Sequence, residues 1–127
     1  MSIITEQSPL IFNDALPDAV DVVIIGAGIA GTETSYFLAQ HGLRVALCEK
    51  GRVAGEQSSR SFGWIRQQGR DPAELPIMME SNRIWRGLAE ETGEADLSFN
   101  ESGCYYFAES QASLAHYEQW HELARQH

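Results

Sequence analysis

Apolar positions are clustered in two short runs near the start of the chain, with a longer mixed run between them. The β-branched run 22–25 predicts a buried strand, and the run 44–49 predicts a second one. The bulky apolar residues of the run 29–41, followed by Gly42, predict a helix that ends at that glycine. The order strand, helix, strand predicts an α/β fold built on a βαβ unit with parallel strands.

The rest of the chain predicts helices and a hairpin. The segment 71–76 has acids and prolines where a helix should begin, and apolar residues from Leu75 onward follow at three- and four-residue spacings. This pattern predicts an amphipathic helix ending near Gly93. Its apolar stripe is assigned to packing and consists of Leu75, Met78, Met79, Trp85, Leu88 and Ala89. Residues 97–99 and 104–107 predict a β-hairpin, and Ser110 is expected to cap a last helix. Residues 1–19 are expected to be an irregular lead-in.

Three glycines, Gly26, Gly28 and Gly31, occupy the turn between the first strand and the helix. Gly26 permits a tight turn, Gly28 lets a diphosphate approach the backbone, and Gly31 lets the helix pack closely on the strands. The helix then begins with free N–H groups and a positive dipole end. Glu49 ends the second strand 18 residues past Gly31, where a carboxylate can accept hydrogen bonds from a ribose. The combination predicts dinucleotide binding, with FAD or NAD favoured over NADP because an acid repels a 2′-phosphate.

Composition narrows the class of protein. A chain of 127 residues holds one domain or less, and its net charge of −9 argues against general nucleic-acid or anionic-membrane binding. The N-terminus has no signal-peptide pattern, and no apolar run is long enough to cross a bilayer. We expect Cys48 and Cys104 to be buried free thiols in a reducing cytoplasm, and a single disulfide between them is the alternative. The histidines and cysteines lack metal-ligand spacing, so no metal site is expected.

A basic segment, residues 50–70, follows Glu49. It contains one acid, Glu56, against five basic residues: Lys50, Arg52, Arg60, Arg66 and Arg70. Glycines and serines, among them Ser58 and Ser59, supply turn geometry and hydrogen-bond donors. We interpret the segment as a loop wrapped on phosphates, and a solvated basic loop is the alternative.

The run 22–64 resembles the N-terminus of FAD-dependent oxidoreductases of the D-amino-acid oxidase type, which include glycine and sarcosine oxidases and D-amino-acid dehydrogenases. The resemblance extends to the chain end and is strongest from Val22 to Trp64. Many flavoproteins share the glycine turn, and the loop with Ser58 and Ser59 narrows the choice of family. It implies that the turn holds the FAD pyrophosphate, Glu49 the ribose and Lys50 the adenine end. The implied cofactor-binding residues are Gly26, Ala27, Gly28, Ile29, Ala30, Gly31, Glu49, Lys50, Ser58, Ser59, Arg60, Gly63 and Trp64.

Within that set, the resemblance places Ser58 and Ser59 near the pyrophosphate and flavin. It places Arg60, Gly63 and Trp64 near the isoalloxazine. Arg60 stands where several amine oxidases carry a histidine tied to flavin attachment, which argues against a covalent flavin at that position. The alternative to a flavin contact for Trp64 is that it packs in the core as an aromatic side chain.

The resemblance also implies that this chain is the N-terminal part of a larger two-domain flavoprotein. The expected divisions are a lead-in at 1–19, the Rossmann-like FAD-binding part at 20–93, and the start of a substrate-side segment at 94–127. A C-terminal remainder or a partner subunit would complete the fold and supply most residues that act on an amine or amino-acid substrate. The implied reaction is hydride transfer from a CH–NH bond to the flavin.

Two alternatives stay open: an NAD-dependent dehydrogenase, and a catalytically silent module that binds a nucleotide or contacts a partner chain. The sequence identifies no catalytic acid or base. Arg66, Arg70 and the tyrosines 105 and 106 are the candidates for holding a substrate carboxylate.

Overall fold

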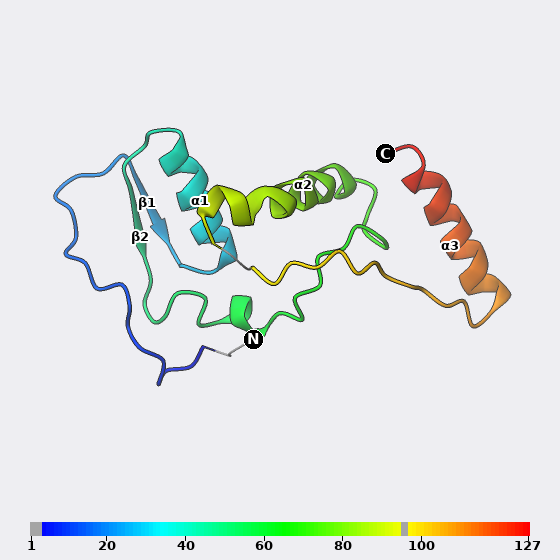
Figure 1. Ribbon diagram of the computed structural model, residues 1–127, viewed down its shortest axis with the longest axis horizontal. Coiled ribbons are helices and arrows are strands. Elements are labelled where there is room, and N and C mark those ends of the chain that lie inside the picture. Colours follow the sequence, from blue (N-terminus) through cyan, green and yellow to red (C-terminus); the bar gives the residue numbers. More distant parts are fainter. Residues whose placement is uncertain (1–3, 95–96) are drawn as a thin grey trace. The chain divides into compact units, whose positions relative to one another are not determined.

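The computed structural model, drawn in Figure 1, describes residues 4–94 and 97–127. These residues divide into two compact units. The first unit runs to Gly63 and the second begins at Trp64.

The first unit contains the predicted βαβ element. Strand β1 (Val22–Ile25) is followed by helix α1 (Ile29–Gln40) and strand β2 (Val45–Cys48). The strands pair in parallel, with Val22 opposite Val45 and Ile25 opposite Cys48, and α1 packs on both strands. The predicted strand, helix and strand are therefore confirmed, and the parallel register brings the exits of β1 and β2 to the same edge of the sheet.

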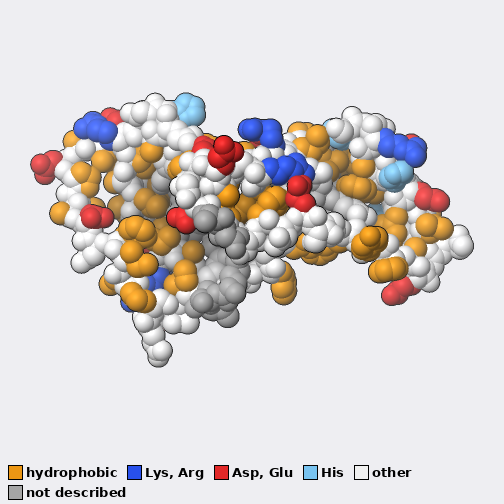
Figure 2. Space-filling model, in the orientation of Figure 1, with side chains coloured by type: hydrophobic (Ala, Val, Ile, Leu, Met, Phe, Trp, Pro, Cys, Tyr) orange, Lys and Arg blue, Asp and Glu red, His pale blue; other side chains and the backbone are white. Residues whose placement is uncertain are grey.

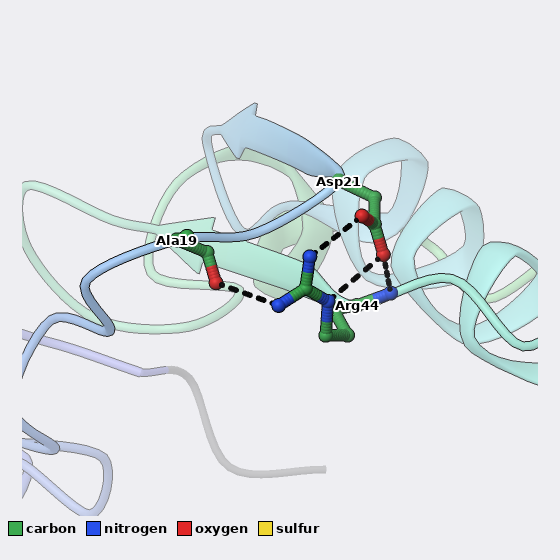
Figure 3. Close-up of polar contacts among 3 residues, drawn as sticks. All are labelled: Ala19, Asp21 and Arg44. Carbon is green, nitrogen blue, oxygen red and sulfur yellow. Dashed lines mark hydrogen bonds and ion pairs between the residues drawn. The ribbon is translucent and has the colours of Figure 1, made fainter.

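The start of the sheet is fastened by a contact between Asp21 and Arg44, which precede β1 and β2 (Figure 3). Asp21 Oδ2 accepts from the backbone N–H of Arg44 at 2.8 Å and from its Nε at 3.1 Å, and Oδ1 accepts from Nη2 at 2.9 Å. Arg44 Nη1 also donates to the Ala19 carbonyl at 3.5 Å. These hydrogen bonds lower the pKa of Asp21 and fix where the lead-in joins the sheet.

Between residues 4 and 20 the chain forms no helix or strand, and residues 1–3 of the expected lead-in lie outside the described residues. Arg52 holds part of this lead-in, because its guanidinium donates to the carbonyls of Ser8 at 2.7 Å and Glu6 at 3.0 Å. The lead-in is therefore tied to the loop that follows β2.

The second unit contains two helices, α2 (Leu75–Thr92) and α3 (Gln111–Ala124). Gly93 is the C-cap residue of α2. The predicted apolar stripe of this helix is buried at Leu75, which is 3% exposed, and half-buried at its other positions. Ser110 caps α3: its hydroxyl accepts the Ser113 N–H at 3.2 Å, while Ser113 Oγ accepts the Ser110 N–H at 3.0 Å. Both predicted helices and the predicted cap are confirmed.

The predicted β-hairpin is wrong. The described residues 97–109 contain no strand, and Ser98 has a φ of 54°, which breaks the extended conformation that a strand requires. Two such short segments pairing only with each other are marginal in water. The segment is instead held by Phe99, whose ring stacks on Trp85 at 5.9 Å, and by Glu101, which accepts from Arg86 Nε at 2.7 Å.

This irregular segment also changes the expectation for the cysteines. Cys104 is exposed, because the apolar run around it pairs with no sheet among the described residues, and Cys48 in β2 is half-buried. Both are free thiols, so the disulfide alternative is not formed in this structure.

Large apolar side chains remain exposed on the first unit. Val23 and Ile25 in β1 are 58% and 89% exposed, and the sheet that the described residues form has two strands. Orange hydrophobic atoms are visible across the face drawn in Figure 2. None of the helices in the described residues is long and apolar enough to span a membrane.

Candidate functional site

The turn between β1 and α1 has the geometry that its glycines predict. Gly26 has a φ of 101°, a conformation that residues with a Cβ rarely adopt, and its N–H donates to the Cys48 carbonyl at 2.7 Å. A Cβ on Gly31 would lie 1.9 Å from the Gly26 carbonyl oxygen and 3.4 Å from Ile24 Cγ2. Helix α1 can therefore begin this close to the end of β1 because Gly31 has no side chain. The structural roles predicted for these two glycines are confirmed.

The N-terminus of α1 presents a group of backbone donors. Thr32 N–H already bonds to the Gly28 carbonyl at 3.0 Å, and Ile29 N–H donates to Ser58 Oγ at 2.8 Å. Within the described part of the chain, the N–H groups of Gly28, Ala30 and Gly31 have no hydrogen-bond acceptor. Three free donors at the positive end of a helix dipole form an environment suited to a phosphate or diphosphate.

Glu49 lies beside this turn, at the exit of β2. Its Oε2 accepts the Ala27 N–H at 2.8 Å and its Oε1 accepts the Gly51 N–H at 2.8 Å. These two hydrogen bonds, and to a smaller extent the positive charge of Lys50, hold the pKa of Glu49 below its ordinary value. Each carboxylate oxygen keeps a second lone pair, so the ionised group can accept further hydrogen bonds from a ribose.

Glu49 predicts a pH dependence of stability. Because its pKa in the folded chain is lowered from 4.5, its contribution is fully present above about pH 4.5 and is lost as the pH falls through the lower folded value. Asp21 and Glu80 also have lowered pKa values, through Arg44 and Arg83, and act in the same direction. We expect E49Q to make the acid limb of the stability profile shallower, measured by chemical denaturation from pH 3 to pH 7. An unchanged slope would contradict the assignment to Glu49.

The loop after β2 is attached to the turn through Ala54. Its N–H donates to the carbonyl of Ala27, a residue that is 1% exposed, at 2.8 Å, and its carbonyl accepts the Ser59 N–H at 3.1 Å. Ala54 has a φ of 58°, in the left-handed region that favours glycine. No sequence pattern indicated this contact, because alanine is not a residue that marks a left-handed turn.

We expect substitutions at Ala54 to follow its backbone geometry. A54V should destabilise the chain by about 1–2 kcal/mol, because a β-branched side chain is strained at positive φ. A54G should leave stability nearly unchanged, because relief of strain offsets the entropy that glycine gains when unfolded. Thermal unfolding monitored by circular dichroism checks the order, and a valine variant as stable as A54G would contradict it.

The two serines that the sequence treats as a pair have different contacts. Both lie in the 3₁₀ helix η1 (Gln57–Arg60). Ser58 Oγ faces the turn, where it accepts the Ile29 N–H and lies 3.2 Å from the place a Cβ on Gly28 would occupy. Ser59 Oγ donates to the Glu56 carbonyl at 3.2 Å, inside its own loop. The structure therefore brings Ser58, and not the Ser59 hydroxyl, onto the glycine turn.

The arginines of the basic segment contact the chain itself. Arg52 holds the lead-in, as described above, and Arg60 donates to the Gly55 carbonyl at 2.7 Å and pairs with Glu56 at 3.7 Å. Arg70 pairs with Glu74 at 3.7 Å. Lys50 is exposed next to Glu49. The groups at the turn are therefore its own backbone N–H donors and the Ser58 hydroxyl, which accepts one of them, rather than these guanidinium groups.

Trp64 begins the second unit, where it belongs to an aromatic cluster. Its ring stacks on Tyr106 with a centroid distance of 6.2 Å, and the Arg66 guanidinium lies 5.0 Å from its ring centroid. Arg66 Nη1 also donates to the Tyr106 hydroxyl at 3.2 Å, and Tyr106 contacts Tyr117 edge-on at 5.8 Å. The contact of Trp64 with a flavin stays a prediction, as does that of Gly63, which ends the first unit. The sequence suggested Arg66, Arg70 and the tyrosines 105 and 106 as candidates for holding a carboxylate, but it did not indicate that Arg66 and Tyr106 contact each other and Trp64.

Comparison with known proteins identifies the class to which this fold and turn belong. Residues 21–127 match the model of the FAD dependent oxidoreductase family, so the chain belongs to that family. The structure is similar to L-amino acid deaminase from Proteus myxofaciens in complex with anthranilate, with a TM-score of 0.85 and 37% identity. That match covers 90% of this chain and 25% of the deaminase chain.

Two sequence relatives are oxidases. Glycine oxidase of Bacillus subtilis is 29% identical over 110 residues, covering 81% of this chain and 30% of the relative. Sarcosine oxidase subunit beta of an Arthrobacter species is 38% identical over 85 residues, covering 65% of this chain and 21% of the relative. The chain thus spans less than a third of the length of these relatives, and the predicted family resemblance is confirmed.

Proposed function

We propose that this chain binds FAD and forms the N-terminal cofactor-binding part of an oxidoreductase acting on an amino acid or secondary amine. The observation that carries the proposal is the set of three free N–H groups, from Gly28, Ala30 and Gly31, beside the carboxylate of Glu49. A diphosphate joined to a ribose requires this combination of donors and an acceptor.

The described residues fit the cofactor at the diphosphate and the ribose. The turn 26–31 would hold the diphosphate on backbone donors, and Glu49 would accept a hydrogen bond from the adenosine ribose. Lys50 follows Glu49 and would lie toward the adenine end. We keep Ser59, Arg60, Gly63 and Trp64 as proposed contacts from family resemblance, with Trp64 and Gly63 toward the isoalloxazine.

When bound, FAD supplies the oxidant that takes a hydride from the carbon next to an amine nitrogen, leaving an imine that water hydrolyses. The role that we propose for the residues of this chain is to hold and orient the cofactor. The names of the relatives support an amino-acid substrate class, since they refer to L-amino acids, glycine and sarcosine.

We also propose that further polypeptide, in the same chain or a partner subunit, covers the sheet of the first unit. Val23 and Ile25 expose apolar side chains on β1, which a monomeric sheet would normally bury. Additional strands beside β1 or β2 would satisfy the open edges of a two-stranded parallel sheet. A cytoplasmic location stays a prediction from the sequence.

Titration of the purified chain with FAD, followed by removal of free cofactor, tests the proposal. We expect retained flavin absorption near about 370 and 450 nm and saturable quenching of flavin fluorescence. A colourless chain that instead binds NADH would favour an NAD-dependent dehydrogenase. A folded chain that binds neither cofactor would overturn the proposal in favour of a catalytically silent module.

A further inference from the structure

The N-terminus of α1 lacks a cap of its own. Its N-cap residue is Gly28, which has no side chain to accept a hydrogen bond from the first turn. A helix leaves its first N–H groups without intrahelical acceptors, and here these belong to Gly28, Ile29, Ala30 and Gly31. Glycine at this position allows close approach of a ligand, but it removes the usual means of satisfying these donors.

The missing cap is supplied from the loop after β2. Ser58 Oγ lies 2.8 Å from the Ile29 N–H, and these residues are 29 positions apart in sequence. The same oxygen lies 3.2 Å from the place a Cβ on Gly28 would occupy, so this glycine leaves the space that the hydroxyl uses. A side chain on Gly28 would therefore crowd the loop as well as any ligand.

The loop itself is placed by contacts independent of Ser58. Ala54 bonds to the Ala27 carbonyl, and Arg60 donates to the Gly55 carbonyl within the loop. Ser59, the neighbouring hydroxyl, is directed to the Glu56 carbonyl instead. Ser58 is thus the serine of the pair whose hydroxyl contacts the helix that begins at the turn.

We propose that Ser58 is a positioning residue of the nucleotide site, which caps α1 from the loop after β2. By accepting the Ile29 N–H, its hydroxyl holds the loop over Gly28. The four N–H groups at the start of α1 then fall into two sets. One donor is satisfied by the protein, and those of Gly28, Ala30 and Gly31 are left for the diphosphate. The inference rests on the proposed function for the identity of the ligand, whereas the cap itself is a property of the chain without FAD.

The test compares S58A, S58T and the control S61A in the full 127-residue chain. Ser61 lies in the same loop, and its exposed hydroxyl accepts the Gly63 N–H at 3.1 Å. Hydrogen exchange of the Ile29 amide is measured by NMR without FAD, and the FAD dissociation constant is measured separately. We expect S58A to accelerate Ile29 exchange roughly tenfold, the size typical of losing a helix cap, and to weaken FAD binding by a similar factor. S58T, which keeps the hydroxyl, should restore both values, and S61A should leave both unchanged.

Each outcome bears on one of the two proposals. An Ile29 amide that exchanges freely in the wild-type chain, or equally fast in wild type and S58A, would overturn the cap. Weaker FAD binding in S58A with unchanged Ile29 exchange would overturn it too, because Ser58 would then act as a direct ligand. If Ile29 exchange responds as expected but the wild-type chain binds no FAD, the cap stands and the proposed cofactor fails.

Discussion

Replacing Gly31 with alanine is expected to destabilise the chain by about 3 kcal/mol and to weaken FAD binding at least about 100-fold. The added methyl group would lie 1.9 Å from the Gly26 carbonyl oxygen and 3.1 Å from the Gly26 carbonyl carbon. Both atoms belong to the backbone, so no side chain can rotate to relieve the clash. Helix α1 would have to move away from β1, carrying the free N–H groups out of alignment with Glu49.

The matched control for this substitution is G87A. Gly87 lies in the interior of α2, and a Cβ there would meet nothing within 4 Å. Alanine at an open helical position should stabilise by roughly 0.5–1 kcal/mol, because it restricts the unfolded chain more than glycine does. Urea denaturation and flavin titration of both variants give the comparison. A G31A chain with wild-type stability and affinity would show that the close packing of α1 on β1 is not required.

The βαβ unit could be predicted because its signals are local. Val22 to Ile25 form an apolar β-branched run. The turn requires a positive φ at position 26 and leaves no room for a Cβ at position 31, so both positions favour glycine. The cap at Ser110 was predictable for the same reason, since a capping residue and its partner are three positions apart.

The remaining contacts of the site depend on residues far apart in sequence. Ser58 and Ile29 are 29 positions apart in the sequence, and Arg52 and Ser8 are 44 positions apart. Contacts between residues so far apart produce no periodic pattern in the sequence. The charge of residues 50–70 suggested arginines on phosphates, but composition does not show that Arg52 and Arg60 bind backbone carbonyls of their own chain. The hairpin prediction failed because two short apolar runs separated by a turn with a glycine were taken as strands, whereas two such segments that pair only with each other are marginal in water.

Glu49 was predicted from its place at the strand end, but the structure gives it a second task that changes the expected effect of losing it. Its carboxylate satisfies the N–H of Ala27, which is 1% exposed, and that of Gly51. E49A therefore removes the proposed ribose acceptor and leaves a buried backbone donor without an acceptor at the same time. We expect FAD affinity to fall by about tenfold or more, with E49Q intermediate because an amide oxygen can accept one of the two hydrogen bonds.

The control for lost negative charge is E56A. Glu56 is an exposed acid in the same loop, 3.7 Å from Arg60, and the carbonyl that accepts the Ser59 hydroxyl remains in the alanine variant. Fluorescence titration with FAD at fixed ionic strength should show wild-type affinity for E56A. Equal losses in E49A and E56A would mean that overall charge, rather than the contacts of Glu49, controls binding. If the contacts of Glu49 are responsible, the Ala27 amide should also exchange faster in E49A without cofactor, because the carboxylate that protects this amide belongs to the folded turn itself.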